Sequence, residues 1–402
     1  MGNPATAHSG KRRFQAAAAL LALLLFVPFP VPAQAEPAAA ASPPSETPPP
    51  PSISAEAAAL IDVRSGRLLY SKNGDEPRLI ASLTKIMTAI VAIEHGGLSD
   101  RVKVGKNASG KEGSSLYLQL GEEMSLENML YGLMLRSGND AATAIAEHVG
   151  GSVEGFAYLM NRKAEELGLA NTHFVNPHGL DEEDHYSTAN DLAKLTAYAL
   201  RNPTFQEIVR TKVKTAPNPN GKWNYRWRNK NKMLLFYEGA DGVKTGYTKA
   251  AGRGLVSSAT RGGQQLAAVT LNAPNDWSDH TALLNYGFAN YPLETIVRKG
   301  QNLTNTALVP AETVLYPLTE EEKHGLRLIV QEEAENPIED RFGIRGKLLI
   351  ELHGKPIASV DLVEDAAPDR AASAERAGPW EAVRSYLARV PEAVRAVWYA
   401  LF

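Results

Sequence analysis

Ser82 and Lys85 are three residues apart at the start of a stretch with helical character. Residues three apart on a helix share a face, so the hydroxyl and the amine can meet. A serine hydroxyl is a weak nucleophile until a base removes its proton, and a lysine can be that base when burial and nearby cations lower its pKa. Taken alone, such a pair arises by chance in a chain of 402 residues and usually lies on a solvated helix face.

Two further groups contain residue types that could act on a peptide. Ser137-Gly138-Asn139 falls between helical stretches at 126–135 and 141–149, where a glycine suits a tight turn that presents a hydroxyl and an amide. In Lys244-Thr245-Gly246, a strand edge could grip a carboxylate, and Gly246 would let a substrate backbone approach closely. Each group also has a plain structural interpretation, a helix cap for the first and a turn with a surface lysine for the second.

The elements that must position these groups are strands near both ends of this region and helices between them. Residues 58–63 and 67–70, joined by Arg64-Ser65-Gly66, predict a β-hairpin, and 255–260 and 266–271 predict two more strands around Gly262-Gly263. Helices are expected at 81–91, 125–149, 153–167 and 280–291. Strands at both ends with helices between them indicate an α+β domain over 53–291, whose sheet is assembled from distant segments.

The segment after Tyr291 has a different character. Residues 326–331, 347–352 and 356–363 predict short strands, the last two joined by His353-Gly354-Lys355. We expect a small β-rich domain over 292–366. It contains no cluster of candidate catalytic residues.

The two ends of the chain predict export and a membrane contact. Basic residues, an apolar run and Ala33-Gln34-Ala35 are typical of a signal peptide over 1–35, followed by a Pro-rich linker over 36–52. A retained N-terminal anchor is the alternative. Residues 377–402 carry one apolar helical stripe with Trp, Tyr and Arg, which favours an amphipathic helix on the membrane surface over a helix docked on its own protein. The expected location is the outer face of the cytoplasmic membrane or the cell wall.

Composition excludes several classes of function. The 42 basic residues nearly balance the 45 acidic ones, for a formal charge of −3, which argues against a nucleic-acid-binding protein. The chain has no cysteine, so thiol nucleophiles, thiolate metal sites and disulfides are excluded.

The order of the three groups resembles the signature of penicillin-binding proteins and serine β-lactamases. The stretches 133–142, 174–180 and 185–189 narrow that resemblance to D-alanyl-D-alanine carboxypeptidases, low-molecular-mass penicillin-binding proteins, over roughly 53–291. The resemblance implies a β-lactamase/transpeptidase-like fold, in which an antiparallel sheet has helices on both sides. It extends to the β-rich domain and the amphipathic tail, which are common in that family.

The resemblance also implies roles for the site residues, with peptidoglycan stem peptides as substrate and β-lactams as inhibitors. Ser82 would be the nucleophile, Lys85 its base, and Ser137 would pass a proton to the leaving D-alanine. Asn139 would bond the substrate amide, and Lys244 and Thr245, beside Gly246, would hold its carboxylate. The backbone N–H groups of Ser82 and Tyr247 would form the oxyanion hole. No metal or cofactor is implied.

One departure and three alternatives stay open. Many members carry an arginine before the last helix of the catalytic domain, whereas residues 275–280 contain none, so carboxylate binding falls to Lys244 and Thr245, with Arg253 as a further candidate. A β-lactamase would need Glu182 or Glu183 to activate water. A metal peptidase could use His178, Asp181 and His185. A non-catalytic β-lactam-binding wall protein would keep the fold without the reaction.

Overall fold

The structure is a computed structural model that describes residues 49–304, 306–332 and 343–365. The chain divides into two units, Met1–Ser45 and Glu46–Phe402, and every described residue belongs to the second. The expected signal peptide at 1–35, most of the linker at 36–52 and the expected amphipathic helix at 377–402 lie outside the described residues. These three predictions stay predictions.

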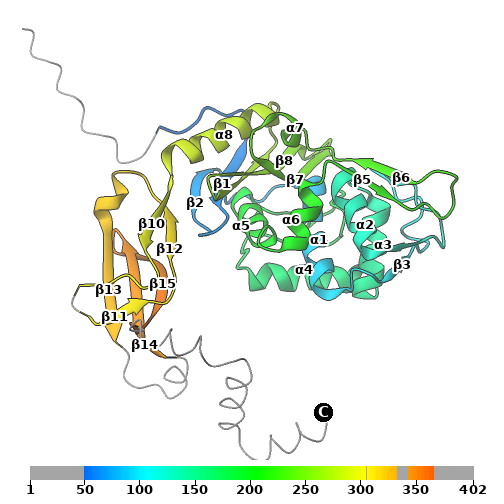
Figure 1. Cartoon of the computed structure of the whole chain (residues 1–402). Helices are drawn as coiled ribbons and strands as arrows, with labels where there is room; N and C mark the ends of the chain where they lie inside the picture. The colour runs from blue at the N-terminus through cyan, green and yellow to red at the C-terminus, as the bar shows by residue number, and fades with distance from the viewer. Residues whose placement is uncertain (1–48, 305, 333–342, 366–402) are drawn as a thin grey trace, which may run out of the picture. The chain divides into compact units, whose positions relative to one another are not determined.

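A five-stranded antiparallel sheet forms the centre of the larger part of the fold (Figure 1). Its order is β2-β1-β9-β8-β7, so the first strand pairs with one that lies about two hundred residues later, with Ala58 opposite Thr270. The sheet is therefore assembled from distant segments, as the sequence predicts. Its strands are β1 (Ala57–Asp62), β2 (Leu68–Lys72), β7 (Ala240–Thr248), β8 (Gly252–Arg261) and β9 (Gln264–Leu271).

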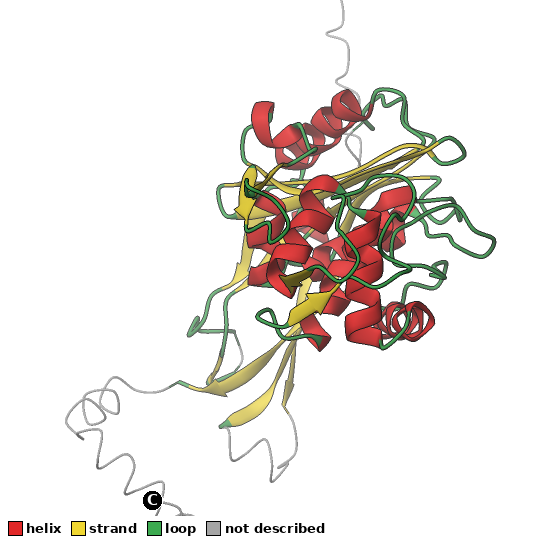
Figure 2. Ribbon diagram, turned by 90° about the vertical axis from the view of Figure 1, so that its right-hand side faces the viewer, coloured by secondary structure: helices red, strands yellow, loops and turns green. Residues whose placement is uncertain are grey.

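Both faces of this sheet are buried, because helices cover each of them (Figures 1 and 2). Along β1, Ala57, Ala59 and Ile61 join one hydrophobic core, while Ala58 and Leu60 join another. Alternate residues of a strand point to opposite faces, so a strand buried on both sides reads as a continuous apolar run. The second core includes residues of α8 (Asp276–Asn290), and the first includes residues of the other long helices.

Those other helices lie between β2 and β7 in the sequence. They are η1 (Ala81–Thr84), α1 (Lys85–His95), α2 (Leu126–Tyr131), the π-helical turn η2 (Gly132–Arg136), α3 (Asn139–Gly150), α4 (Val153–Glu166), α5 (Ala189–Ala199), α6 (Pro203–Arg210) and α7 (Met233–Phe236). Two short hairpins, β3 (Arg101–Lys103) with β4 (Glu123–Ser125) and β5 (Val213–Ala216) with β6 (Tyr225–Arg228), complete this region.

The structure agrees with the predicted turn at Ser137 and adds helices that the sequence did not predict. The break between the helical stretches 126–135 and 141–149 falls at Ser137, whose φ of 67° lies in the left-handed region. Helices α5 and α6 were not predicted from the sequence, although each carries a start signal. The Thr188 hydroxyl caps α5, and Asn202 caps α6 immediately before Pro203.

Beyond Tyr291 the described chain forms strands and one short turn of helix. A four-stranded antiparallel sheet has the order β11-β15-β14-β13, and β10 pairs with β12. Leu348, Ile350 and Leu362 are fully buried in the core of this region. The elements are β10 (Leu293–Val297), β11 (Leu308–Pro310), β12 (Val314–Pro317), η3 (Glu322–Gly325), β13 (Leu326–Glu332), β14 (Ile344–Leu352) and β15 (Lys355–Glu364).

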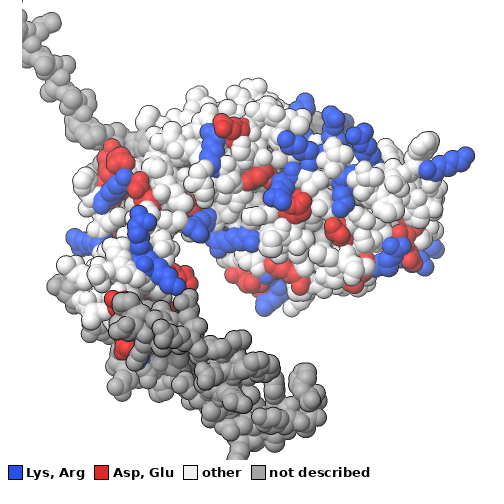
Figure 3. Space-filling view, in the orientation of Figure 1, with Lys and Arg blue, Asp and Glu red and all other residues white. Residues whose placement is uncertain are grey.

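The surface fits the near balance of charge in the sequence. On the face shown in Figure 3, Lys and Arg side chains are interspersed with Asp and Glu. Within the described ranges, no helix combines the length and the apolar character that crossing a membrane requires.

Candidate active site

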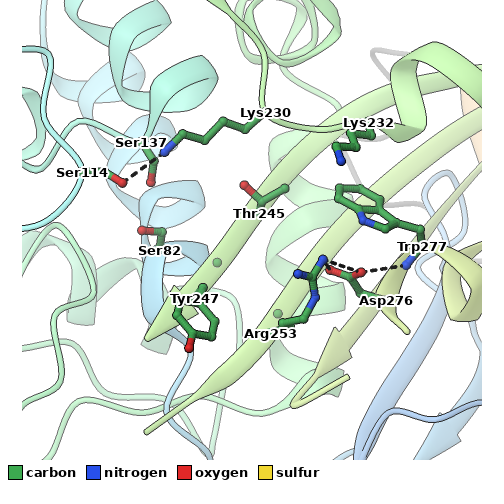
Figure 4. Close-up of a pocket in the computed structure, with 12 residues that line it drawn as sticks. Ser82, Ser114, Ser137, Lys230, Lys232, Thr245, Tyr247, Arg253, Asp276 and Trp277 are labelled. Atoms are coloured by element: carbon green, nitrogen blue, oxygen red, sulfur yellow. Dashed lines mark hydrogen bonds and ion pairs between the residues drawn. The ribbon is translucent and has the colours of Figure 1, made fainter. Parts of the chain in front are cut away.

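A cleft of about 410 Å³ opens at the edge of the sheet and brings the three motifs together (Figure 4). Its volume falls in the range of small-molecule sites. The residues that line it come from η1, the Ser137 turn, the loops near Ser114 and Lys230, the strands β7 and β8, and the start of α8. Segments more than one hundred and fifty residues apart in the sequence therefore contribute to one cavity.

Ser82 lies in the 3-10 turn η1, directly before α1, and not in the α-helix that the sequence predicts. The preceding residue, Ala81, has a φ of 47°, a left-handed conformation that is costly for a residue with a Cβ atom. Lys85 is the first residue of α1, and its Nζ atom lies 3.1 Å from Ser82 Oγ. The expected contact between the hydroxyl and the amine is present, at hydrogen-bond distance.

Lys85 is completely buried and bonded on every side. Its Nζ atom also donates to Asn139 Oδ1 at 2.7 Å and to the backbone oxygen of His178 at 2.6 Å. A neutral amine has two N–H donors and one lone pair, so the Asn139 and His178 oxygens can take the two donors and leave the lone pair for the Ser82 hydroxyl. The amine is therefore held in one position beside the Ser82 hydroxyl.

Burial and nearby cations favour the neutral amine. Desolvation first, then the positive charges of Lys244 and Lys230, hold the pKa of Lys85 well below its usual range, and the negative charge of Asp140 opposes them. A lysine that is neutral near pH 7 can accept a proton from a hydroxyl. The structure thus supplies the burial and the neighbouring charges that such a base needs.

Ser137 is a buried residue of the cleft whose hydroxyl has no partner among the described residues. It ends η2 in the left-handed conformation, it lines the cleft, and only 3% of it is exposed. Among the described residues, its Oγ atom is one of two buried side-chain atoms that have no hydrogen-bond partner. Leaving a buried hydroxyl unpaired costs about 1–3 kcal/mol, so an unpaired one in a cleft is a candidate to bind a ligand.

Asn139 faces Lys85 more than the cleft. Besides accepting from Lys85, its Nδ2 atom donates to the backbone oxygen of Glu112 at 2.7 Å. It is 4% exposed and does not line the cavity. In the substrate-free protein its contacts therefore serve to hold the lysine.

Strand β7 forms one wall of the cleft and is the edge of the sheet. Thr245 and Gly246 line the cavity, whereas Lys244 is 1% exposed and donates to the backbone oxygen of Thr245 at 2.8 Å. Burial, and then the charge of Lys230, lower the pKa of Lys244 to about 7. A Cβ atom on Gly246 would lie 3.2 Å from the backbone oxygen of Ile80, so the glycine lets β7 approach the turn that carries Ser82.

A second glycine, Gly179, supports the same turn from the other side. Its φ is +81°, and a Cβ atom there would lie 1.8 Å from the backbone oxygen of Ala81 and 2.7 Å from Thr84 Oγ1. The turn around Ser82 is therefore pressed against the 174–180 stretch, whose His178 oxygen binds Lys85. This close contact explains why position 179 is a glycine.

We predict that Gly179→Ala displaces the Ser82 turn and lowers the rate of acylation by a fluorescent penicillin by about 100-fold, since a misplacement of about 1 Å has an effect of that order. Gly168→Ala is the matched control. Gly168 also has a positive φ, of +63°, but a Cβ atom added there would have no other atom within 4 Å. Equal losses in the two variants, measured as labelling rates on protein of confirmed thermal stability, would attribute the effect to backbone strain and contradict the prediction.

The residues on which the metal-peptidase and β-lactamase alternatives depend form hydrogen bonds within the protein. His185 Nε2 lies 2.8 Å from Thr84 Oγ1 and its Nδ1 accepts from the Val175 N–H, while Asp181 accepts from the Thr248 hydroxyl. Within the described ranges, no group of three or more His, Cys, Asp or Glu side chains is placed to hold a metal ion. Glu182 accepts a hydrogen bond from Asn176 Nδ2 at 2.9 Å, so it serves to close its own loop.

Two residues of the site, Lys230 and Asp140, were not predicted from the sequence. Lys230 lines the cleft, donates to Ser114 Oγ at 3.1 Å and contributes to lowering the pKa values of both Lys85 and Lys244. Asp140 is fully buried and accepts from the backbone N–H groups of Leu116 and Leu118, which anchors the loop that carries Ser114. The sequence indicated Asp140 only through its position next to Ser137-Gly138-Asn139. No sequence pattern indicated Lys230.

Comparisons with known proteins agree with this site. The sequence profile of the D-alanyl-D-alanine carboxypeptidase family matches residues 44–275. The D-alanyl-D-alanine carboxypeptidase DacF of Bacillus subtilis is 37% identical over 276 residues, which are 67% of this chain and 71% of that protein. DacA of Haemophilus influenzae is 30% identical over 338 residues, 77% of this chain and 84% of that protein.

The solved structures agree as well. Penicillin-binding protein 5 from Haemophilus influenzae superposes with a TM-score of 0.65 and 29% identity, covering 79% of this chain and 99% of that one. Since the family profile covers more than half of the chain and the matched residues include all three motifs, the chain belongs to the D-alanyl-D-alanine carboxypeptidase family.

Proposed function

We propose that this protein removes the terminal D-alanine from peptidoglycan stem peptides that end in D-Ala-D-Ala, by way of an acyl-enzyme on Ser82. The observation that carries the proposal is the contact between Ser82 Oγ and a fully buried lysine amine whose pKa is lowered, at the floor of a cleft that also presents Ser137 and Thr245. β-Lactams acylate the same hydroxyl. Family membership and the names of the relatives support this reading.

In the acylation step, neutral Lys85 takes the proton of the Ser82 hydroxyl while Oγ bonds to the carbonyl carbon between the two D-alanines. The negative charge that develops on the carbonyl oxygen is stabilised by the backbone N–H groups of Ser82 and Tyr247. β7 is an edge strand, so every second N–H of it points away from β8 and is available to a ligand. Asn139 holds Lys85 in place for the transfer.

The tetrahedral intermediate collapses when the carbon–nitrogen bond breaks and the leaving amine takes a proton. Ser137, whose hydroxyl has no partner in the described part of the chain, relays that proton from the Lys85 ammonium to the D-alanine nitrogen. Water then attacks the ester carbonyl, with Lys85 as base, and regenerates the Ser82 hydroxyl. Thr245, lining the cleft beside buried Lys244, supports the carboxylate end of the substrate.

The proposal is tested by incubating the purified protein with a pentapeptide that ends in D-Ala-D-Ala and measuring free D-alanine, alongside covalent labelling with a fluorescent penicillin. Release of D-alanine together with stable labelling is the expected result. Labelling without release would instead indicate a non-catalytic β-lactam-binding protein. Rapid turnover of the penicillin would indicate a β-lactamase.

The pH dependence of kcat/KM should be bell-shaped and should depend on Lys230. Activity requires neutral Lys85, which is lost on the acid side, and protonated Lys244, which is lost as the pH rises through about 7. The Lys230 charge lowers both pKa values, so Lys230→Met should raise both and move the whole profile to higher pH. Lys232→Met is the control, because Lys232 lines the same cleft but is not among the charges that lower the pKa of Lys85 or Lys244. If the pH profile of the Lys230→Met variant matched that of the wild-type protein on both its acid and its alkaline side, this role of Lys230 would be contradicted.

We further propose that the protein is exported and that residues 377–402 hold it at the membrane surface. The support is the sequence pattern of that segment and of 1–35. Deleting Pro379 to Phe402 should move the protein from the membrane fraction to the soluble fraction. An unchanged distribution would contradict the anchor.

A further inference from the structure

The end of the cleft opposite Ser114 and Lys230 contains Arg253, which the sequence offers only as a further candidate for the carboxylate and to which the proposed cycle assigns no step. Arg253 lies on β8 directly opposite Tyr247 of β7, and therefore on the same face as Thr245, two residues along that strand. All three line the cavity. In Figure 4 the guanidinium group lies between Thr245 and Tyr247 on one side and Asp276 and Trp277 on the other.

Asp276, the first residue of α8, holds the guanidinium from behind. Both of its carboxylate oxygens accept from Nη2 of Arg253, at 2.8 Å each, and its Oδ1 also accepts from the Trp277 N–H. The Asp276 side chain is 5% exposed and the Arg253 side chain 46%. The carboxylate is therefore the buried, fixed partner, while the arginine faces the cavity.

Asp276 engages only some of the N–H donors of Arg253. A guanidinium carries five N–H donors, and Asp276 engages only Nη2, which leaves the Nη1 and Nε groups for a ligand. Planar guanidinium donors match a carboxylate in a bidentate pair. Lys232 also lines this end of the cleft, so Arg253, Lys232 and Asp276 together leave a net positive charge there.

Lys244 is a weaker partner for an anion than its place in the motif implies. It is buried, it does not line the cavity, and its Nζ atom already donates to the backbone oxygen of Thr245. Burial and the charge of Lys230 lower its pKa to about 7, which favours the neutral amine more than in an exposed lysine. A guanidinium group offers a carboxylate a planar fork of N–H donors.

We infer that Arg253, positioned by Asp276, binds the terminal carboxylate of the substrate and makes the enzyme select peptides whose C-terminus is free. This inference rests on the proposed function. It adds the residue that distinguishes a substrate with a free C-terminal carboxylate from one whose carboxylate is blocked. Thr245 and the guanidinium contact the carboxylate from the two strands. Asp276 is a positioning residue, because its carboxylate holds Arg253 and carries the same charge as the substrate carboxylate.

The test uses a pair of N-acylated D-alanyl thioesters, one with a thioglycolate leaving group that ends in a carboxylate and one with the methyl ester of that group. Both are activated acyl donors, so a variant that loses selectivity remains measurable. Released thiol is read with a thiol reagent, and the protein gives no background because it has no cysteine. The kcat/KM ratio of the two thioesters measures recognition of the carboxylate alone.

The wild-type protein should prefer the free carboxylate. A hydrogen-bonded charge contributes about 1.5–3 kcal/mol, so Arg253→Ala should lower kcat/KM for that thioester by about 10- to 100-fold and leave the methyl ester nearly unchanged. Arg253→Lys should keep part of the preference, and Asp276→Asn should reduce it. Lys249→Ala is the control, since it removes a positive charge from the exposed turn of the same hairpin and should change neither substrate.

Two results would overturn the inference. Equal losses on both thioesters would show that Arg253 serves only the structure of the cleft, and no loss on either would show that it does not contact the substrate. Failure of the proposed function itself is separate, because the wild-type protein would then release no D-alanine from the pentapeptide, whatever the variants do.

Discussion

Replacing Ser82 by alanine is expected to abolish both penicillin labelling and D-alanine release. The Oγ atom of Ser82 is the only part of the protein that forms a covalent bond in the proposed cycle, so no acyl-enzyme can form without it. Removing a nucleophile from a preorganised site lowers kcat by about 10⁶-fold in a measured serine peptidase, and we expect at least about 10⁴-fold here. Labelling followed on a gel and D-alanine measured over hours cover this range.

The control for this variant is Ser99→Ala, a change of the same type in the exposed turn after α1. It should label at the wild-type rate. Thermal unfolding should show that the Ser82 variant is folded, because its hydroxyl accepts from Lys85 but supports no other described element. Persistent labelling of the Ser82→Ala protein would mean that another residue is the nucleophile.

Lys85→Arg should be the second most damaging change, although it keeps a basic side chain. Arginine cannot give up its proton at working pH, so it cannot accept the proton of Ser82. It would also be a permanent charge in a fully buried position, whose present partners are arranged around an amine. General-base catalysis contributes about 10²- to 10⁴-fold, and we expect a loss of acylation rate within or above that range.

The chain offers a matched control in Lys163, a lysine that is also mostly buried but works as a cation. Its side chain is 9% exposed, and its Nζ atom forms ion pairs with Glu94 at 2.9 Å and with Glu166 at 2.6 Å. Hydrogen bonds to these carboxylates raise its pKa, against the effect of burial. Lys163→Arg should therefore keep the acylation rate. If Lys85→Arg labelled as fast as this control, Lys85 would not be the base.

Much of the fold could be predicted because its signals are local. Alternating or continuous apolar runs around Ser65-Gly66 and Gly262-Gly263 predict hairpins, and both hairpins are present as β1–β2 and β8–β9. The periodic stretch 153–167 is helix α4. Helix and strand periodicity belongs to each segment separately, so it can be read without knowing what the segment packs against.

Other local features could not be predicted, because packing overrides propensity. Ser82 lies in a 3-10 turn and not in an α-helix, since the close contacts of Gly179 and Gly246 with that turn constrain its backbone. The sequence predicts a turn at Ser137, but not that the backbone of this serine adopts a left-handed conformation. Neither residue type favours these conformations, and only neighbours distant in the sequence impose them.

The sequence by itself determined which residue types could react. The order of Ser82, Lys85, Ser137 and Lys244, within segments of known character, was enough to point to acyl transfer on a serine hydroxyl and to a family. Only the tertiary structure decided what state those residues are in. Burial of Lys85, the charges of Lys230 and Lys244 beside it, the unpaired hydroxyl of Ser137 and the anchoring of Arg253 by Asp276 all arise between segments far apart in the chain. A pKa and the partners of a polar group depend on distances in space, which spacing along the sequence does not specify.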